Sequence, residues 1–153
     1  MRSIVLNLQL ACKKKQGLPK KKDFLRWVQC AVSSCYHQKN SKEITVRIVD
    51  KAESRILAMI YLGKNQPTNV LSFHFTAPPE IKSSLLGDLV ICRQVVEFEA
   101  RQQKKKLESH WAHMTIHGSL HLLGFNHILD REVLTMESLE IKIMHKLGYL
   151  NPY

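Results

Sequence analysis

Three histidines stand within the eleven residues 117–127, and this spacing constrains the chain more than any other feature. His117 and His121 are four residues apart, so a helix places them one turn apart on the same face. Gly124 can end that helix in the left-handed conformation, after which the chain can turn back and bring His127 to the same point. Three neutral imidazoles with one open coordination position are the ligand set of a catalytic zinc site. The spacing therefore predicts a metal-dependent hydrolase.

The residue after the first histidine helps to distinguish a peptidase from a hydrolase that acts on phosphodiesters. The histidine spacing equals that of the zinc peptidases with the motif H-E-x-x-H-x-x-G-x-x-H. In those enzymes the glutamate is the general base, whereas this chain has Gly118, which cannot accept a proton. Phosphodiester hydrolysis fits better, because a metal lowers the pKa of its bound water to about 7 and polarises a phosphoryl oxygen. A metallopeptidase is the weaker alternative.

Hydrophobic periodicity predicts an α+β fold in a single domain covering residues 1–153. Alternating apolar residues predict strands over about 4–10, 43–49, 70–75 and 85–92, and helical spacing predicts helices over about 20–36, 50–62, 93–104, 108–123 and 131–147. The first two strands are expected to be parallel, and the last two antiparallel. The result is a small mixed four-stranded sheet packed against about five helices, with the metal site on a buried helix in the C-terminal half.

The helix expected over 50–62 carries two further predictions. Asp50 and Glu53 have the spacing of a capping box, with Asp50 as the N-cap. Ile56, Leu57 and Ile60 follow helical spacing and are expected to be buried against the rest of the domain.

Basic residues dominate the first quarter of the chain. The formal net charge is +10, and residues 1–40 hold nine Lys or Arg against one acidic residue, Asp23. Six of the lysines form two clusters, Lys13, Lys14, Lys15 and Lys20, Lys21, Lys22. Such clusters favour a polyanionic partner, above all a nucleic acid. A solvated lysine-rich surface without a partner is an equally open alternative.

Several classes of protein are not expected. No apolar run approaches the roughly 18–20 residues of a membrane span, and residues 1–7 lack the apolar stretch of a signal peptide. The four cysteines, Cys12, Cys30, Cys35 and Cys92, include no C-x-x-C pair. We therefore expect reduced thiols in a cytoplasmic protein, with neither a membrane partner nor a nucleotide cofactor.

The helix expected over 108–123 is apolar around most of its circumference, yet His110, His113, His117 and His121 share one narrow stripe. Burying four imidazoles along one line is costly unless each has a partner, and a metal in a water-filled cleft would supply one. His113 is either a group that supports the metal ligands, a group that faces substrate, or a satisfied core histidine. His110 lies too far along the helix to be a ligand.

Three segments of this chain resemble the YbeY family of bacterial endoribonucleases, also called rRNA maturation factors. The family motif H-G-x-L-H-L-x-G-Y-D-H matches His117–His127, P-T-[ND]-V-L-S-F matches Pro67–Phe73, and L-G-D-[IL]-x-I-[CS] matches Leu86–Cys92. The similarity extends over nearly the whole chain, and the histidine motif is long and specific.

This resemblance implies a single α+β domain with one zinc ion bound by His117, His121 and His127. It implies cleavage of single-stranded RNA, a role in maturation of the 3′ end of small-subunit ribosomal RNA, and a role in late ribosome quality control. The implied partners are ribosomal RNA in the small ribosomal subunit and proteins associated with the ribosome.

Two departures from the family pattern affect the expected chemistry. Phe125-Asn126 replaces Tyr-Asp, which removes a charge beside His127. Leu62 replaces the arginine that the family favours as its catalytic or RNA-contacting cation, and a leucine cannot stabilise a phosphate charge. The catalytic residue is therefore unknown, with four candidates: Lys64, Arg47, Arg55 and His113. The alternative function is a ribosome-assembly or RNA-binding factor with a mainly structural zinc and weak nuclease activity.

Overall fold

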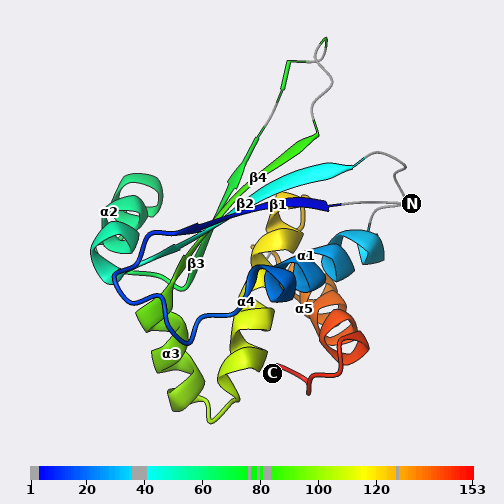
Figure 1. Ribbon diagram of the computed structural model, residues 1–153. Helices are drawn as coiled ribbons and strands as arrows, with labels where there is room; N and C mark the ends of the chain where they lie inside the picture. Colours follow the sequence, from blue (N-terminus) through cyan, green and yellow to red (C-terminus); the bar gives the residue numbers. More distant parts are fainter. Residues whose placement is uncertain (1–3, 36–40, 76, 79, 81–83, 127) are drawn as a thin grey trace.

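The computed structural model describes residues 4–35, 41–75, 77–78, 80, 84–126 and 128–153. Within these residues it contains four strands and five helices, close to the predicted ranges (Figure 1). The elements are β1 (Ile4–Leu10), α1 (Lys21–Cys35), β2 (Lys42–Val49), α2 (Lys51–Leu62), β3 (Val70–His74), β4 (Leu85–Cys92), α3 (Arg93–Gln102), α4 (Leu107–Leu122) and α5 (Asp130–Lys146). The predicted α+β class and mixed four-stranded sheet are confirmed.

The sheet has the strand order β1-β2-β4-β3. β1 pairs with β2 and β2 with β4 in parallel, whereas β3 pairs antiparallel with β4 and forms an edge. The connection from β1 to β2 contains α1, and the connection from β2 to β4 contains α2 and β3. The predicted parallel and antiparallel pairs are both confirmed.

The two faces of the sheet are covered differently. In Figure 1, α1, α4 and α5 lie on one side of the sheet and α2 lies on the other. Side chains alternate along β2, so that Ile44, Val46 and Ile48 are fully buried in the larger core with α1 and α4. The other face has a smaller apolar cluster, against which Leu57 of α2 packs. The histidine helix therefore lies on the side with the larger core.

The predicted packing of α2 is wrong for two of its three residues. Ile56 is 58% exposed and Ile60 is 66% exposed, while Leu57 is half-buried. The helix lies against the sheet through the small residues Ser54 and Ala58, which allow close approach. The large apolar residues of α2 therefore do not mark the side of the helix that faces the sheet.

The predicted capping box is also wrong. Asp50 is the N-cap residue of α2, as predicted, and is extended, but its side chain makes no cap hydrogen bond. Its carboxylate instead accepts hydrogen bonds from the backbone N–H of Lys13, at 2.9 Å, and from the side chain of Gln94, at 2.7 Å. Glu53 pairs with Arg47. Tertiary partners have thus replaced the local contacts that the sequence predicts. Gly63 ends the helix in the left-handed conformation.

The four cysteines are free thiols, as predicted. Across the described parts of the chain, none of the helices has the length and hydropathy needed to cross a membrane.

Candidate metal centre

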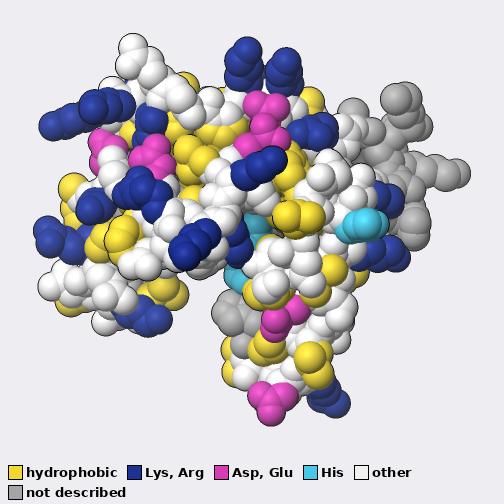
Figure 2. Space-filling model, turned by 90° about the horizontal axis from the view of Figure 1, so that it is seen from below, with side chains coloured by type: hydrophobic (Ala, Val, Ile, Leu, Met, Phe, Trp, Pro, Cys, Tyr) yellow, Lys and Arg dark blue, Asp and Glu magenta, His cyan; other side chains and the backbone are white. Residues whose placement is uncertain are grey.

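α4 carries the histidine stripe through the interior of the domain. The helix is buried on most sides, with Trp111, Ile116 and Leu120 at no more than 1% exposure. Successive histidine rings along the stripe lie 6.1, 6.3 and 4.7 Å apart, centroid to centroid. Figure 2 shows histidine side chains where the surface is hollowed, with Lys and Arg side chains on the same face. Along the stripe, His110 and His113 are buried whereas His117 and His121 are half-buried, so the stripe runs from the interior toward the surface.

Gly118 allows α4 to pack closely on β3 and β4. A Cβ atom at this position would lie 2.8 Å from the side chain of Leu89 and 3.0 Å from that of Val70. The Gly118 carbonyl also accepts a hydrogen bond from the Ser72 hydroxyl, at 3.0 Å. A side chain here would point into the sheet, so a glutamate could not act as the peptidase-type base. This packing gives a structural reason for the glycine that the sequence left unexplained.

A buried carboxylate from α5 organises the middle of the stripe. The Glu140 side chain is 0% exposed, and it lies 2.8 Å from His113 Nε2 and 2.6 Å from His117 Nδ1. The Tyr153 hydroxyl donates a third hydrogen bond to it. Burial by itself would raise the Glu140 pKa, but the hydrogen bonds and charges of the two histidines outweigh it and lower the pKa to about 2. The carboxyl group is therefore ionised at neutral pH.

The hydrogen bonds to Glu140 determine which histidine nitrogens carry protons. Burial lowers the pKa of His113, which favours its neutral form. Since the Glu140 carboxylate is an acceptor only, His113 donates its Nε2–H to it and His117 donates its Nδ1–H. His113 Nδ1 is buried without a hydrogen-bond partner among the described residues, as befits an unprotonated nitrogen. In neutral His117, the unprotonated nitrogen is then Nε2.

Two sets of donor atoms could hold a metal ion. The donor atoms of His113, His117 and Glu140 lie within 4.8 Å of one another. The second set begins with His117 Nε2 and His121 Nε2, which are 3.2 Å apart. Two nitrogens bound at about 2.0–2.1 Å to a tetrahedral zinc lie roughly 3.3–3.4 Å apart, so this pair fits zinc directly. His127, the third predicted ligand, lies outside the described residues.

A second histidine–carboxylate pair lies at the N-terminal end of the stripe, near the start of α4. His110 Nε2 is 2.8 Å from Glu99 of α3, and Glu99 also accepts hydrogen bonds from the side-chain amide of Asn69, at 3.2 Å. These contacts join the turn before β3 to α3 and α4. The neighbouring Thr68 exchanges hydrogen bonds with the Ser54 hydroxyl. His110 is thus engaged away from the metal centre, and the Thr-Asn turn has a structural role.

The candidate catalytic cations lie elsewhere. Arg47 is on the sheet face opposite α4, where it pairs with Glu53 at 2.7 and 3.0 Å and contacts Gln9 at 2.9 Å. Arg55 and Lys64 are exposed on and just after α2. No hydrogen bond or ion pair joins any of these three cations to the histidine stripe within the described part of the chain. Of the four candidates, only His113 belongs to the histidine stripe.

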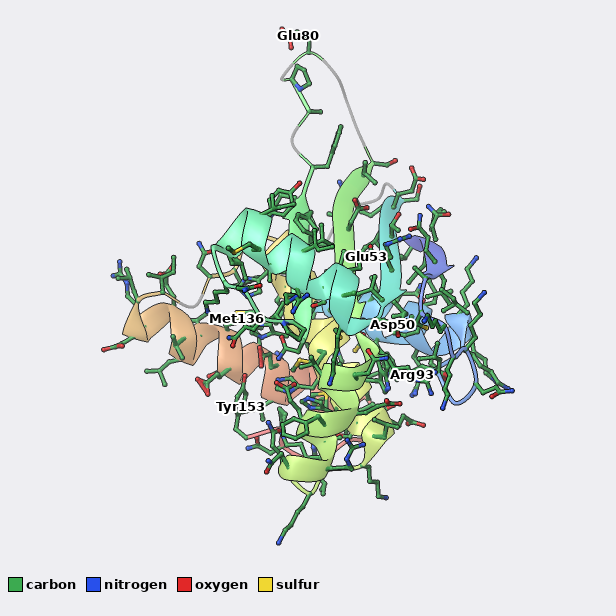
Figure 3. All side chains as sticks on the ribbon, turned by 90° about the vertical axis from the view of Figure 1, so that its left-hand side faces the viewer. Asp50, Glu53, Glu80, Arg93, Met136 and Tyr153 are labelled. Carbon is green, nitrogen blue, oxygen red and sulfur yellow. The ribbon has the colours of Figure 1, made fainter. Side chains whose placement is uncertain are left out.

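The lysine clusters lie at the surface, as predicted. Lys13, Lys14, Lys15, Lys20, Lys21 and Lys22 are all exposed. The backbone of the first cluster is held in place, because the Arg93 guanidinium donates to the carbonyls of Lys14 and Gln16. Lys13 and Lys14 line an open depression of about 800 Å³, and Figure 3 labels Arg93 and Asp50 from its rim. The cluster is thus presented on an ordered loop.

Sequence reasoning missed Glu140 and Tyr153. A signal for Glu140 was present, because it falls on the apolar stripe of α5 with Met136, Ile143 and Met144, all buried. A carboxylate at such a position needs a buried partner. Tyr153 had no comparable signal, because the short segment after α5 has no periodicity that predicts its packing.

Comparisons with known proteins agree with this architecture. The family model of endoribonuclease YbeY matches residues 9–148. The chain is also similar to a solved structure, the solution structure of TM1509 from Thermotoga maritima, with 18% sequence identity and a TM-score of 0.56. That match covers 92% of this chain and 91% of the other, and at this identity it supports the fold. The family match covers well over half of the sequence, and the chain belongs to the YbeY endoribonuclease family.

Proposed function

We propose that this chain is a zinc-dependent endoribonuclease that cuts single-stranded RNA, acting in 3′-end maturation of small-subunit ribosomal RNA and in late ribosome quality control. Membership of the YbeY family supports the reaction class. The observation that carries the metal site is the 3.2 Å separation of His117 Nε2 and His121 Nε2. In this proposal His117, His121 and His127 bind one zinc ion in a cytoplasmic protein.

The donor chemistry fits zinc, since imidazole nitrogens are among its preferred ligands. When bound, zinc would supply a Lewis acid that activates a water or hydroxyl nucleophile and stabilises phosphoryl charge. The chain's own residues prepare the ligands. Glu140 accepts a hydrogen bond from the Nδ1–H of His117, which keeps the proton on Nδ1 and leaves Nε2 unprotonated. His113 supports the same carboxylate at 2.8 Å, which makes it a supporting group for the ligands.

Charge favours an RNA substrate. The chain carries a formal net charge of +10, and the six clustered lysines of residues 13–22 are exposed. A polyanion is attracted to such a surface, and neutralising phosphates releases counterions. Lysine side chains would therefore bring RNA to the domain without reading its sequence. Ribosomal RNA, the small subunit and ribosome-associated proteins are the partners in this proposal.

A second candidate function is a ribosome-assembly factor in which zinc mainly stabilises the fold. Leu62 favours it, because this side chain is 50% exposed and carries no charge where the family has an arginine. Lys64 and Arg55 are exposed cations near it in the sequence and are the candidates to substitute for that arginine.

Cleavage of matched oligonucleotides tests the proposal. The zinc-loaded protein should cut a single-stranded RNA, lose this activity to a chelator and regain it with zinc. DNA of the same sequence should be cut more slowly if the 2′-hydroxyl takes part. Absence of cleavage by the wild type, with cleavage appearing in Leu62→Arg, would favour the assembly factor. Casein hydrolysis that a chelator abolishes would instead revive the metallopeptidase.

A further inference from the structure

The segment that follows α5 returns to the metal centre. The Tyr153 hydroxyl reaches Glu140, and the Tyr153 ring lies 5.3 Å from the ring of His113 in an edge-to-face arrangement. Figure 3 shows Tyr153 beside the ribbon of α5. A tyrosine from outside any helix or strand thus contacts the carboxylate that holds a proposed metal ligand.

Tyr153 acts on one oxygen of Glu140 and His117 on the other. Oε2 accepts hydrogen bonds from the Tyr153 hydroxyl and from His113, whereas Oε1 accepts the hydrogen bond from His117 Nδ1, at 2.6 Å. Two donors on Oε2 fix the rotation of the carboxylate. Oε1 is then directed at His117, which fixes the orientation of that ring.

The segment is itself held at a second point. The Lys105 ammonium, from the connection between α3 and α4, donates a hydrogen bond to the Pro152 carbonyl. Lys105 is half-buried, and this burial lowers the pKa of its ammonium below the ordinary value. The Tyr153 backbone N–H donates to the Asn151 side chain at 2.8 Å. These contacts connect the segment to the α3–α4 connection through Lys105 and to the middle of the stripe through Glu140 and His113.

We propose that Tyr153 is a positioning residue for the metal centre, acting through Glu140 to hold His117 in the tautomer that leaves Nε2 unprotonated. The segment 148–153 is in this view part of the metal site, although it provides no ligand. The inference rests on the proposed zinc site. Residues that orient metal-bound histidines typically change metal affinity about 10–100-fold when they are removed.

A comparison of two tyrosine variants, one the test and the other its control, examines this inference. Tyr153→Phe removes only the hydroxyl that contacts Glu140. Tyr149→Phe is the matched control, since the Tyr149 hydroxyl accepts a hydrogen bond from Trp27 at 3.1 Å and donates to Glu108 at 2.7 Å. The control therefore loses more hydrogen bonds, in the same segment, away from the histidine stripe.

Two readouts are needed. Zinc affinity, measured by competition with a chromogenic chelator, should fall about 10-fold in Tyr153→Phe and stay unchanged in Tyr149→Phe. In the metal-free protein, the nitrogen chemical shifts of His117 should show Nδ1–H in the wild type and a mixture of tautomers in Tyr153→Phe. Unchanged zinc affinity and an unchanged His117 tautomer in Tyr153→Phe would overturn the inference.

A third variant separates this inference from the proposed function. Glu140→Gln should lower zinc affinity at least as much as Tyr153→Phe. A loss in Glu140→Gln with none in Tyr153→Phe would contradict the role of Tyr153. If the wild type binds no zinc, the proposed function fails, while the His117 tautomer in metal-free protein still decides whether Tyr153 positions the ring.

Discussion

The two faces of the sheet differ in how far their ionisable side chains are exposed to solvent. On the α4 side, His113 and His117 share the carboxylate of Glu140, which is inaccessible to water. On the α2 side, Arg47 and Glu53 form an ion pair whose side chains are 36% and 37% exposed. The same sheet thus separates a buried network from a solvated pair.

This difference in exposure indicates which face of the sheet carries the candidate metal centre. Buried polar groups are costly unless each is satisfied, so a line of them is informative. Exposed ion pairs contribute little and need no special explanation. The side chains of Arg55 and Lys64 are likewise exposed on the α2 side and bear no relation to the buried network. The comparison therefore favours the α4 side as the metal centre, and the following variants test it.

The largest expected effect comes from removing the buried carboxylate. Glu140→Ala should lower the free energy of unfolding by about 1–3 kcal/mol for each imidazole that it leaves without an acceptor, the buried His113 and the half-buried His117. Arg47→Ala, the matched change on the α2 side, should cost less than about 1 kcal/mol. Urea unfolding of the metal-free variants measures both. Equal losses of unfolding free energy in Glu140→Ala and Arg47→Ala would contradict the proposed difference between the two faces of the sheet.

Acid should act on the same carboxylate. The Glu140 pKa is about 2 in the folded protein and about 4.3 in an unfolded chain. Its contribution to stability is therefore complete above pH ~4.3 and lost as the pH falls toward 2, by roughly 3 kcal/mol. Urea unfolding between pH 5 and pH 3 should show a shallower pH dependence in Glu140→Gln than in the wild type. Parallel pH curves would contradict this assignment.

A smaller loss of folding stability is expected from a change at the contact between α4 and the sheet. Gly118→Ala places a Cβ 2.8 Å from Leu89 and 3.0 Å from Val70, and such overpacking costs about 1–3 kcal/mol. The gain in helix propensity, about 1 kcal/mol, offsets part of this loss. Thermal unfolding should therefore show a net destabilisation. A stabilised variant would show that the packing is looser than described.

The smallest expected change concerns RNA affinity alone. Replacing Lys13, Lys14 and Lys15 together by alanine should weaken RNA binding and reduce the slope of log affinity against log salt by up to about 2. Lys146→Ala, an exposed lysine at the end of α5, is the control and should have a smaller effect. Filter binding at several salt concentrations measures this. An unchanged slope in the triple variant would favour a solvated surface without a partner.

The sequence predicted the elements of the fold better than their packing. Alternation and helical periodicity depend on local geometry, so the strands and helices were found within a few residues. The burial of Ile56 and Ile60 was predicted wrongly, since small residues elsewhere on α2 determine which side approaches the sheet. Asp50 found tertiary partners in place of a local cap.

The candidate site was predictable only where its residues share one helix. His117 and His121 approach each other because a helix turn places them together, and their spacing is visible in the sequence. Glu140 and Tyr153 join them from separate segments. The apolar stripe of α5 indicates that Glu140 is buried, but not which residues it contacts, and Tyr153 has no local pattern at all. The ligand role of His127 stays a prediction.

Metal content of two histidine variants tests the central claim most directly. His121→Ala and the control His145→Ala, an exposed histidine on α5, should be purified, incubated with zinc and analysed by atomic emission. We expect one equivalent of zinc in the wild type and in His145→Ala, and none in His121→Ala. One full equivalent of zinc in His121→Ala would contradict the assignment of the metal centre to the histidine stripe.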